Sequence, residues 1–194
     1  MADAKRIGRR DAMQILSGGI GAGFALPGLA AAHPMHAHLA DQAKVATAQR
    51  RAAAAAYKPA YLDAQQFATT KAMAERIVPG AGRAKTAEFV DQLLAVDAQS
   101  NQRRFLSALG SFEGRALEDG KGPWTSLTPA QQDTILTDAS TAETGTRLRD
   151  DFDLLKGWIA GAYYSSEIGM RELGWTGNVM HLEFPGCAHP EGHH

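Results

Sequence analysis

The chain has a single cysteine, Cys187, among its 194 residues. One thiol cannot form an internal disulfide bond, nor can it supply the several thiolates of a cysteine-based zinc site. The chain also lacks a surplus of charge, since its formal net charge is −1. Nucleic-acid binding needs a clustered basic face, so this balance argues against a nucleic-acid partner. The apolar fraction of 44% is sufficient to fill the core of one domain.

Charged side chains are absent from residues 12–32. A basic segment precedes this stretch, which is weakly apolar and ends in three alanines. That order is typical of a bacterial signal peptide, which we expect to occupy residues 1–32. The adjacent pair Arg9 and Arg10 indicates the twin-arginine export machinery, which carries proteins that have already folded. An uncleaved membrane anchor is the alternative, although five glycines make the stretch a poor bilayer span.

The sequence also lacks a complete phosphate-binding glycine loop. Gly19, Gly21 and Gly23 lie close together, but Phe24 occupies the position of the third glycine of the dinucleotide motif, and no strand precedes it. Hydride transfer requires a bound flavin or nicotinamide. No base and nucleophile can be paired in the remaining sequence. We therefore expect that this chain binds no cofactor and is not catalytic alone.

Alternation typical of strands is missing as well, and helical periodicity takes its place, so we predict an all-α fold. Residues 33–60 are an Ala/His-rich arm with helical character near residues 43–57, and residues 61–194 form a helical domain with a C-terminal tail. Asp63 and Gln66 are able to cap a helix that ends at Pro79-Gly80. A second helix is predicted to begin near residue 86.

The clearest start signal in the chain is Thr128-Pro129-Ala130-Gln131. Threonine caps a helix, proline is favoured in the first turn, and glutamine three residues after the cap completes a capping box. Before it, the glycine content predicts a loop over residues 110–125. After it, the last long helix is predicted over residues 151–173, with Gly174 as its cap.

The last predicted helix carries a face of minimal side chains, because Gly157, Gly161, Ser165 and Gly169 recur every four residues. Three glycines cost a helix roughly 2–3 kcal/mol in propensity relative to alanine, so a close neighbour must offset that loss. Two interpretations stay open for this face. It packs tightly inside the domain, or it packs against another subunit.

The segment after this helix is an irregular tail that is too apolar for a solvated end. Tails of this kind wrap their own domain or a partner, and we expect Trp175, Phe184 and Cys187 to lie at a partner interface. An odd cysteine in an exported protein indicates either an intermolecular disulfide or a buried free thiol. Both stay open for Cys187.

Histidines gather in the arm as His33, His36 and His38. Cleavage after Ala32 would leave His33 at the N-terminus, where its amine and imidazole are able to chelate copper. A solvated arm without metal is the alternative interpretation. The histidine patch supports a second hypothesis for the function, a periplasmic metal-binding or carrier protein.

Three segments carry a resemblance to a known family. They are Ile77-Val78-Pro79-Gly80, Leu127-Thr128-Pro129-Ala130-Gln131-Gln132, and the run that contains Tyr163-Tyr164-Ser165-Ser166-Glu167-Ile168-Gly169, Glu172-Leu173-Gly174-Trp175 and Gly177-Asn178. Together they resemble the gluconate 2-dehydrogenase subunit 3 family. The last run is the most specific of the three. With the leader, the resemblance covers residues 1–32 and 61–190.

This resemblance implies a function. The small subunits of the family are similar to partners of a large FAD-containing subunit of the glucose-methanol-choline type, which oxidises a sugar, sugar acid or glycoside. A cytochrome c often takes the electrons, and it would associate the complex with the membrane. The small subunit carries the export signal for both chains and stabilises the large one in the periplasm. The Pro-Gly-Cys-x-His-Pro ending resembles the branch that accompanies glucoside 3-dehydrogenases.

Overall fold

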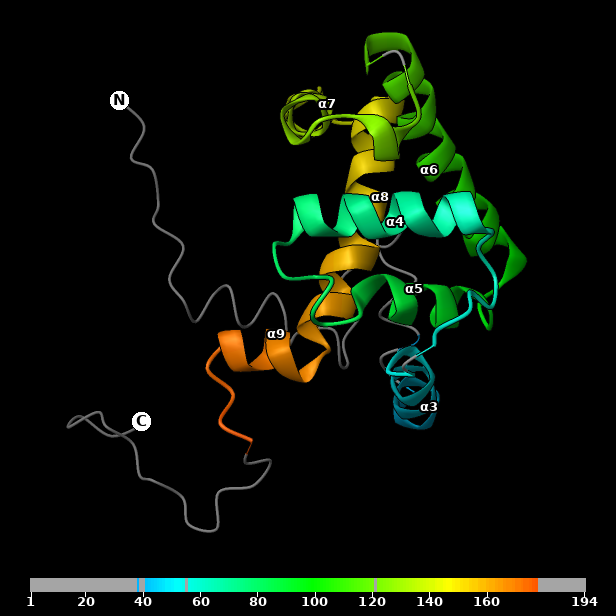
Figure 1. The fold of residues 1–194 in the computed structure, drawn as a ribbon, viewed down its shortest axis with the longest axis vertical. Coiled ribbons are helices and arrows are strands. Elements are labelled where there is room, and N and C mark those ends of the chain that lie inside the picture. The colour runs from blue at the N-terminus through cyan, green and yellow to red at the C-terminus, as the bar shows by residue number, and fades with distance from the viewer. Residues whose placement is uncertain (1–37, 39–40, 55, 121, 178–194) are drawn as a thin grey trace, which may run out of the picture. The chain divides into compact units, whose positions relative to one another are not determined.

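The computed structural model describes residue 38 and residues 41–54, 56–120 and 122–177. Every regular element in those ranges is a helix, which confirms the all-α prediction (Figure 1). The elements are α3 (Gln42–Ala52), α4 (Ala64–Ile77), α5 (Thr86–Leu94), α6 (Gln99–Gly120), the 3-10 helix η1 (Trp124–Ser126), α7 (Pro129–Thr141), α8 (Arg147–Tyr164) and α9 (Glu167–Glu172). The predicted leader lies outside the described residues.

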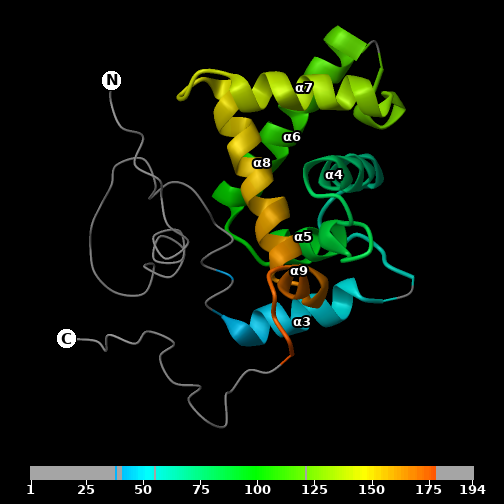
Figure 2. The same cartoon turned by 90° about the vertical axis from the view of Figure 1, so that its left-hand side faces the viewer.

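Helix α8 is the centre of the described helices, because α4, α5, α6 and α7 all pack against it. In two perpendicular views α8 runs through the middle, with α7 near one end and α9 at the other (Figures 1 and 2). Its inward face is fully buried at Leu155, Trp158 and Ile159. The Trp158 ring meets Phe105 of α6 edge-on, with 5.8 Å between ring centroids. Burial of a large apolar side chain contributes about 1.5–3 kcal/mol, so this face organises the core.

Two helices begin where the sequence predicts. Oδ1 of Asp63 accepts from the Gln66 backbone N–H at 2.8 Å, and Oε1 of Gln66 accepts from the Asp63 backbone N–H at 3.1 Å. Thr128 and Gln131 form the same reciprocal capping box before α7. Each box satisfies N–H groups that have no partner inside the helix, which is worth about 1 kcal/mol per cap.

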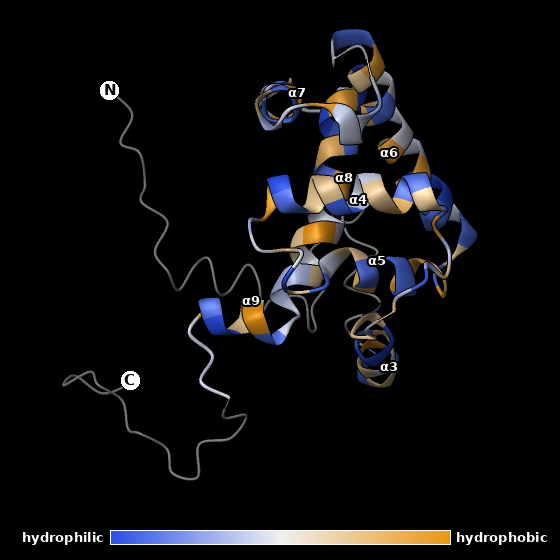
Figure 3. Ribbon diagram, viewed as in Figure 1, coloured by the Kyte–Doolittle hydropathy of each residue, from blue (hydrophilic) through white to orange (hydrophobic). Residues whose placement is uncertain are grey.

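The loop predicted over residues 110–125 is wrong for most of its length, because α6 continues to Gly120. Gly110 and Gly114 lie on the open side of this helix, where a Cβ would meet nothing within 4 Å. The opposite side is apolar at helical spacing and buried, at Phe105, Ala108, Leu109, Phe112 and Ala116. Burial of that face outweighs a propensity loss of about 1 kcal/mol for each glycine. Figure 3 shows how apolar and polar residues alternate along these helices.

The last predicted helix, over residues 151–173, is in fact two helices. Its first part begins earlier, at Arg147, and ends at Tyr164, where Ser166 turns the chain into α9. The Ser166 hydroxyl donates to the Tyr163 carbonyl at 2.6 Å and accepts from the Gly169 N–H at 3.1 Å. This local bonding competes with a continuous helix. Gly174 follows α9 with a φ of 90°, in line with the predicted cap.

The arm supplies α3 to the same compact unit as the later helices. Gln49 donates from Nε2 to the Ser165 carbonyl at 2.9 Å, and thereby ties α3 to the end of α8.

His38 is buried, with its Nε2 3.3 Å from Oδ1 of Asp97 and its ring 6.0 Å from that of Trp158. A solvated side chain is therefore the wrong description of His38. His33 and His36 lie outside the described residues.

Candidate partner site at the α8–α9 corner

Two segments of the family resemblance meet where α8 ends and α9 begins, although they are far apart in sequence. Tyr163 is fully buried, and its hydroxyl lies 3.4 Å from the point that a Cβ on Gly80 would occupy. Nη2 of Arg83 lies 3.2 Å from that same point. Gly80 has a φ of 94°, in the region that favours glycine. The close approach and the φ both explain why position 80 has no side chain.

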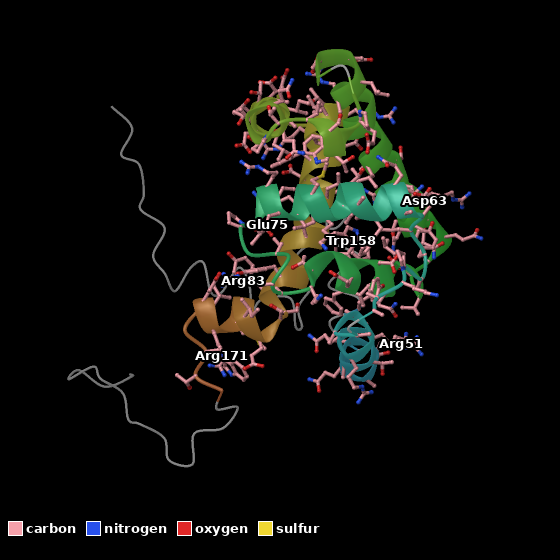
Figure 4. The ribbon with its side chains drawn as sticks, in the orientation of Figure 1. Arg51, Asp63, Glu75, Arg83, Trp158 and Arg171 are labelled. Atoms are coloured by element: carbon pink, nitrogen blue, oxygen red, sulfur yellow. The ribbon has the colours of Figure 1, made fainter. Side chains whose placement is uncertain are left out.

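A carboxylate holds the turn that contains Gly80, which we call the Gly80 turn (residues 78–85). Glu75 accepts from the Gly80 N–H at 2.8 Å and from the Gly82 N–H at 2.9 Å. Lys85, the last residue of the turn, has a left-handed backbone with a φ of 56°, which is unusual for a residue with a side chain. Figure 4 shows Glu75 and Arg83 near the end of α4 that faces α9, with Arg171 on α9 itself. The turn is therefore fixed beside the corner.

The hydrogen bonds to the Gly80 turn give folding a dependence on pH. The two backbone N–H groups, first that of Gly80 and then that of Gly82, lower the pKa of Glu75 below its ordinary value of 4.5. A lowered pKa in the folded state adds stability above the unfolded value, and this stability is lost as pH falls through the folded pKa. We expect Glu75→Gln to lower stability at neutral pH and to remove that part of the acid-induced loss.

Urea denaturation between about pH 3 and pH 7 measures this effect. Glu143→Gln is the matched control, because the Glu143 side chain is exposed and forms no ion pair with a described residue. The control should follow the wild type at every pH. Overlapping profiles for Glu75→Gln and the wild type would show that the turn does not depend on this carboxylate.

Close backbone packing joins the two helices of the corner. Gly169 is buried, and a Cβ on it would lie 2.8 Å from both the Tyr163 carbonyl carbon and the Tyr164 Cα, and closer still to the Tyr163 carbonyl oxygen. Gly169 therefore packs inside the domain, which is the first of the two interpretations of the small-residue face. Because α8 ends at Tyr164, the four small residues do not share one continuous helix. Gly157 and Gly161 remain half-buried on α8.

A buried carboxylate that the sequence analysis missed lies on α5. Asp91 is completely buried and accepts hydrogen bonds from four donors. They are the backbone N–H groups of Ala60 at 2.6 Å, Tyr61 at 3.1 Å and Leu62 at 2.7 Å, and the Tyr57 hydroxyl at 2.5 Å. Burial, followed by the bond to Asp91, raises the pKa of Tyr57. Asp91 thus clamps the connection between α3 and α4, and four donors leave it no role as a free base.

The acidic and histidine side chains of the described residues were compared with the ligand sets of metal sites. Within those ranges, no group of three or more His, Cys, Asp or Glu side chains is placed to hold a metal ion. Among the same residues, no helix combines the length and the apolar character needed to cross a membrane. The chemistry that the described residues do display is hydrogen bonding that fixes turns and helix ends.

A family profile identifies the chain. The profile of gluconate 2-dehydrogenase subunit 3 matches residues 64–186, which is more than half of the sequence. The chain belongs to this family. No curated protein and no solved structure shows a significant match. The match to gluconate 2-dehydrogenase subunit 3 begins with the first residue of α4 and includes both the Gly80 turn and the α8–α9 corner.

Some of the predicted site residues belong to the described part of the chain, and the others lie outside it. Gly169 packs inside the corner, Ser165 closes α8 by donating to the Gly161 carbonyl at 2.6 Å, and Trp175 is half-buried just after α9. The export pair Arg9 and Arg10 and the tail residues Phe184 and Cys187 lie outside the described residues. Gly161, Ser165, Gly169 and Trp175 thus lie at the end of α8 or beyond it, whereas Gly157 lies about two turns earlier in α8.

Proposed function

We propose that this protein is the non-catalytic small subunit of a periplasmic dehydrogenase complex. Its partner is an FAD-dependent catalytic chain of the glucose-methanol-choline type that oxidises a sugar, sugar acid or glycoside. The small subunit binds and stabilises that chain and carries the twin-arginine signal that exports both. A cytochrome c receives the electrons in complexes that contain one. The observation that carries this proposal is the family match over residues 64–186.

The use of the carboxylates supports a scaffold rather than an enzyme. Asp91, Glu75 and Glu113 each accept from backbone N–H groups, the last from Trp124 at 2.9 Å. Catalytic carboxylates instead face a shared cleft where a substrate is able to bind. These three carboxylates hold turns and helix ends in place, and a binding subunit requires a fixed surface of this kind.

Export of the partner tests the proposal. Arg9→Lys combined with Arg10→Lys should strand both this chain and its flavoprotein in the cytoplasm, because a folded, flavin-loaded partner needs the twin-arginine signal of its small subunit. Cell fractionation with flavin fluorescence in each fraction measures the distribution. Lys5→Arg with Arg6→Lys, which keeps the charge outside the pair, should export normally. A flavoprotein that still reaches the periplasm while only this chain is retained would contradict the shared signal.

The second candidate, a periplasmic metal carrier that uses His33, His36 and His38, has less support. The structure buries His38 beside Asp97 and Trp158, which removes it from a solvent-exposed chelating patch. Isolation from the periplasm distinguishes the two functions. A subunit is isolated with a yellow flavoprotein, whereas a carrier is isolated alone with copper or zinc.

A further inference from the structure

A groove with a volume of about 330 Å³ lies between α3 and the end of α5, and we call it the α3 groove. Sites for small ligands have volumes of about 300–1,000 Å³, so this groove has room for one small group but not for a helix of another protein. Charged side chains line it from α3 and its N-cap, among them Arg51, which is labelled on α3 in Figure 4. Gln92 of α5 and Val96, two residues beyond α5, complete the part of the lining that concerns binding.

The α3 groove has a fixed base. Gln92 is buried, and its Nε2 donates to the Tyr57 hydroxyl at 2.9 Å. That hydroxyl in turn donates to the buried carboxylate of Asp91, so the chain that follows α3 is fastened to α5. On the other side, Gln49 ties α3 to the Ser165 carbonyl. The groove is therefore formed before a ligand arrives, and binding costs little conformational entropy.

The charges that line the α3 groove favour an anion. Two of its side chains are cations, Lys44 and Arg51, and one is a carboxylate, Asp41. Lys44 and Asp41 form an ion pair at 3.3 Å, but both side chains are exposed, and exposed pairs contribute little in water. Arg51 is exposed and forms no ion pair with another described residue. Its guanidinium is therefore able to bind an external phosphate, with the Lys44 ammonium as a second donor.

An apolar side chain lines the same groove as these cations. Val96 is 53% exposed, which is unusual for a large apolar residue. A ligand in the groove thus meets positive charge from α3 and an apolar contact from Val96. A free phosphate makes no use of Val96, whereas an anionic phospholipid presents a charged head group together with an apolar chain. The lining therefore fits the surface of an anionic bilayer better than it fits a soluble anion.

The arm that carries the α3 groove is basic, unlike the chain as a whole. Residues 41–62 contain four basic side chains and one acidic side chain, whereas the whole chain has 20 basic and 21 acidic residues. The helix α3 lies at the edge of the described helices, away from α7 (Figures 1 and 2). The family match begins at residue 64, so the arm lies beyond the matched domain. Only eight residues separate the predicted leader from Asp41, so export itself would bring α3 to a membrane surface.

We infer that the α3 groove binds the head group of an anionic phospholipid at a membrane surface. Arg51 and Lys44 donate hydrogen bonds to the phosphate, and Val96 contacts the apolar region beside it. Basic side chains next to a segment that enters a membrane bind anionic lipids through the same attraction. The inference goes beyond the proposed function, because it concerns the arm and requires no flavoprotein.

Co-sedimentation of the full-length chain with lipid vesicles tests the inference. The wild type should bind mixed phosphatidylglycerol and phosphatidylcholine vesicles more tightly than vesicles of phosphatidylcholine alone, and salt should weaken this binding. Lys44→Gln combined with Arg51→Gln should reduce the partition coefficient about 25-fold, because each basic side chain at an anionic surface contributes about fivefold. Val96→Ser should reduce it about threefold through the lost apolar contact.

Lys71→Gln combined with Arg104→Gln is the matched control. It makes the same change of charge at exposed residues of α4 and α6 outside the groove, and it should bind as the wild type does. The leader is identical in every variant, so differences in binding come from the substitutions. All the substituted side chains are exposed, and equal melting temperatures would show that the fold is intact.

Four results would overturn the inference. Equal binding by the groove variant and the wild type would show that the groove holds no lipid, and an equal loss in the control would reduce the effect to general charge attraction. Release of the wild type from the vesicles by inorganic phosphate, at constant ionic strength, would assign the groove to a soluble anion. A groove variant that loses co-purified flavin while its vesicle binding is unchanged would assign the groove to the flavoprotein. A wild type that binds the vesicles but captures no flavin contradicts only the proposed function.

Discussion

Asp91→Ala should lower the free energy of unfolding by about 3–5 kcal/mol, one of the two largest effects expected from a single substitution in this chain. The substitution leaves three backbone N–H groups without their acceptor, in a place where Asp91 is completely buried. The Tyr57 hydroxyl loses one of its two acceptors and keeps the Glu88 carbonyl at 3.1 Å. Since small domains are stable by only about 5–15 kcal/mol, this loss threatens folding itself.

Urea or guanidinium denaturation of the purified chain measures the change. Asp91→Asn keeps one acceptor oxygen and should lose about half as much stability, which distinguishes hydrogen bonding from packing. Asp138→Ala removes an exposed aspartate and should change stability by no more than about 0.5 kcal/mol. If Asp91→Ala and Asp138→Ala unfold at the same denaturant concentration, the clamp does not stabilise the fold.

Local signals were enough to predict several helix boundaries. The capping boxes at Asp63 and Thr128 depend on side chains that reach backbone groups three residues away, so the sequence contains both partners within one turn. The same holds for Gly174, whose positive φ ends α9. The all-α class follows from apolar periodicity, which is also a property of neighbouring positions.

The failures come from interactions that are distant in sequence or from competing local bonds. Asp91 binds donors about 30 positions earlier, and nothing near it in the sequence announces them. The periodicity of the sequence does not predict the break at Ser166, because Ala162, Ser166 and Met170 keep the four-residue spacing of one continuous helix. Glycine content alone does not predict that α6 continues through Gly110, because the buried apolar face of α6 outweighs the low helix propensity of glycine.

The candidate site shows the same division. The sequence predicted that residues near Gly169 and Trp175 matter, because they carry the family resemblance. It could not predict that Gly80 and Arg83 lie beside Tyr163, since that contact depends on how α4 and α8 pack. Exposure is likewise a property of the packed chain. Leu173 is exposed and Leu155 is buried. The sequence does not distinguish them, because the difference depends on where α8 ends and on the direction of α9.

Gly169→Ala should disrupt the α8–α9 corner and lower the free energy of unfolding by about 2–3 kcal/mol. The added Cβ would lie within 2.8 Å of two backbone atoms of α8, and closer to the Tyr163 carbonyl oxygen, and backbone cannot move aside as a flexible side chain does. The helix α9 must therefore shift or detach from the end of α8. We expect this variant to unfold at a lower urea concentration than the wild type.

The control is Gly114→Ala, which makes the same chemical change at an open position of α6, where a Cβ would meet nothing within 4 Å. Because alanine favours a helix more than glycine does, Gly114→Ala should stabilise the chain by about 0.5–1 kcal/mol. Thermal and urea denaturation of the two variants would then move in opposite directions from the wild type. A Gly169→Ala chain as stable as the wild type would mean that α9 is able to leave α8 at little cost. The corner would then be a mobile element rather than a fixed part of the fold.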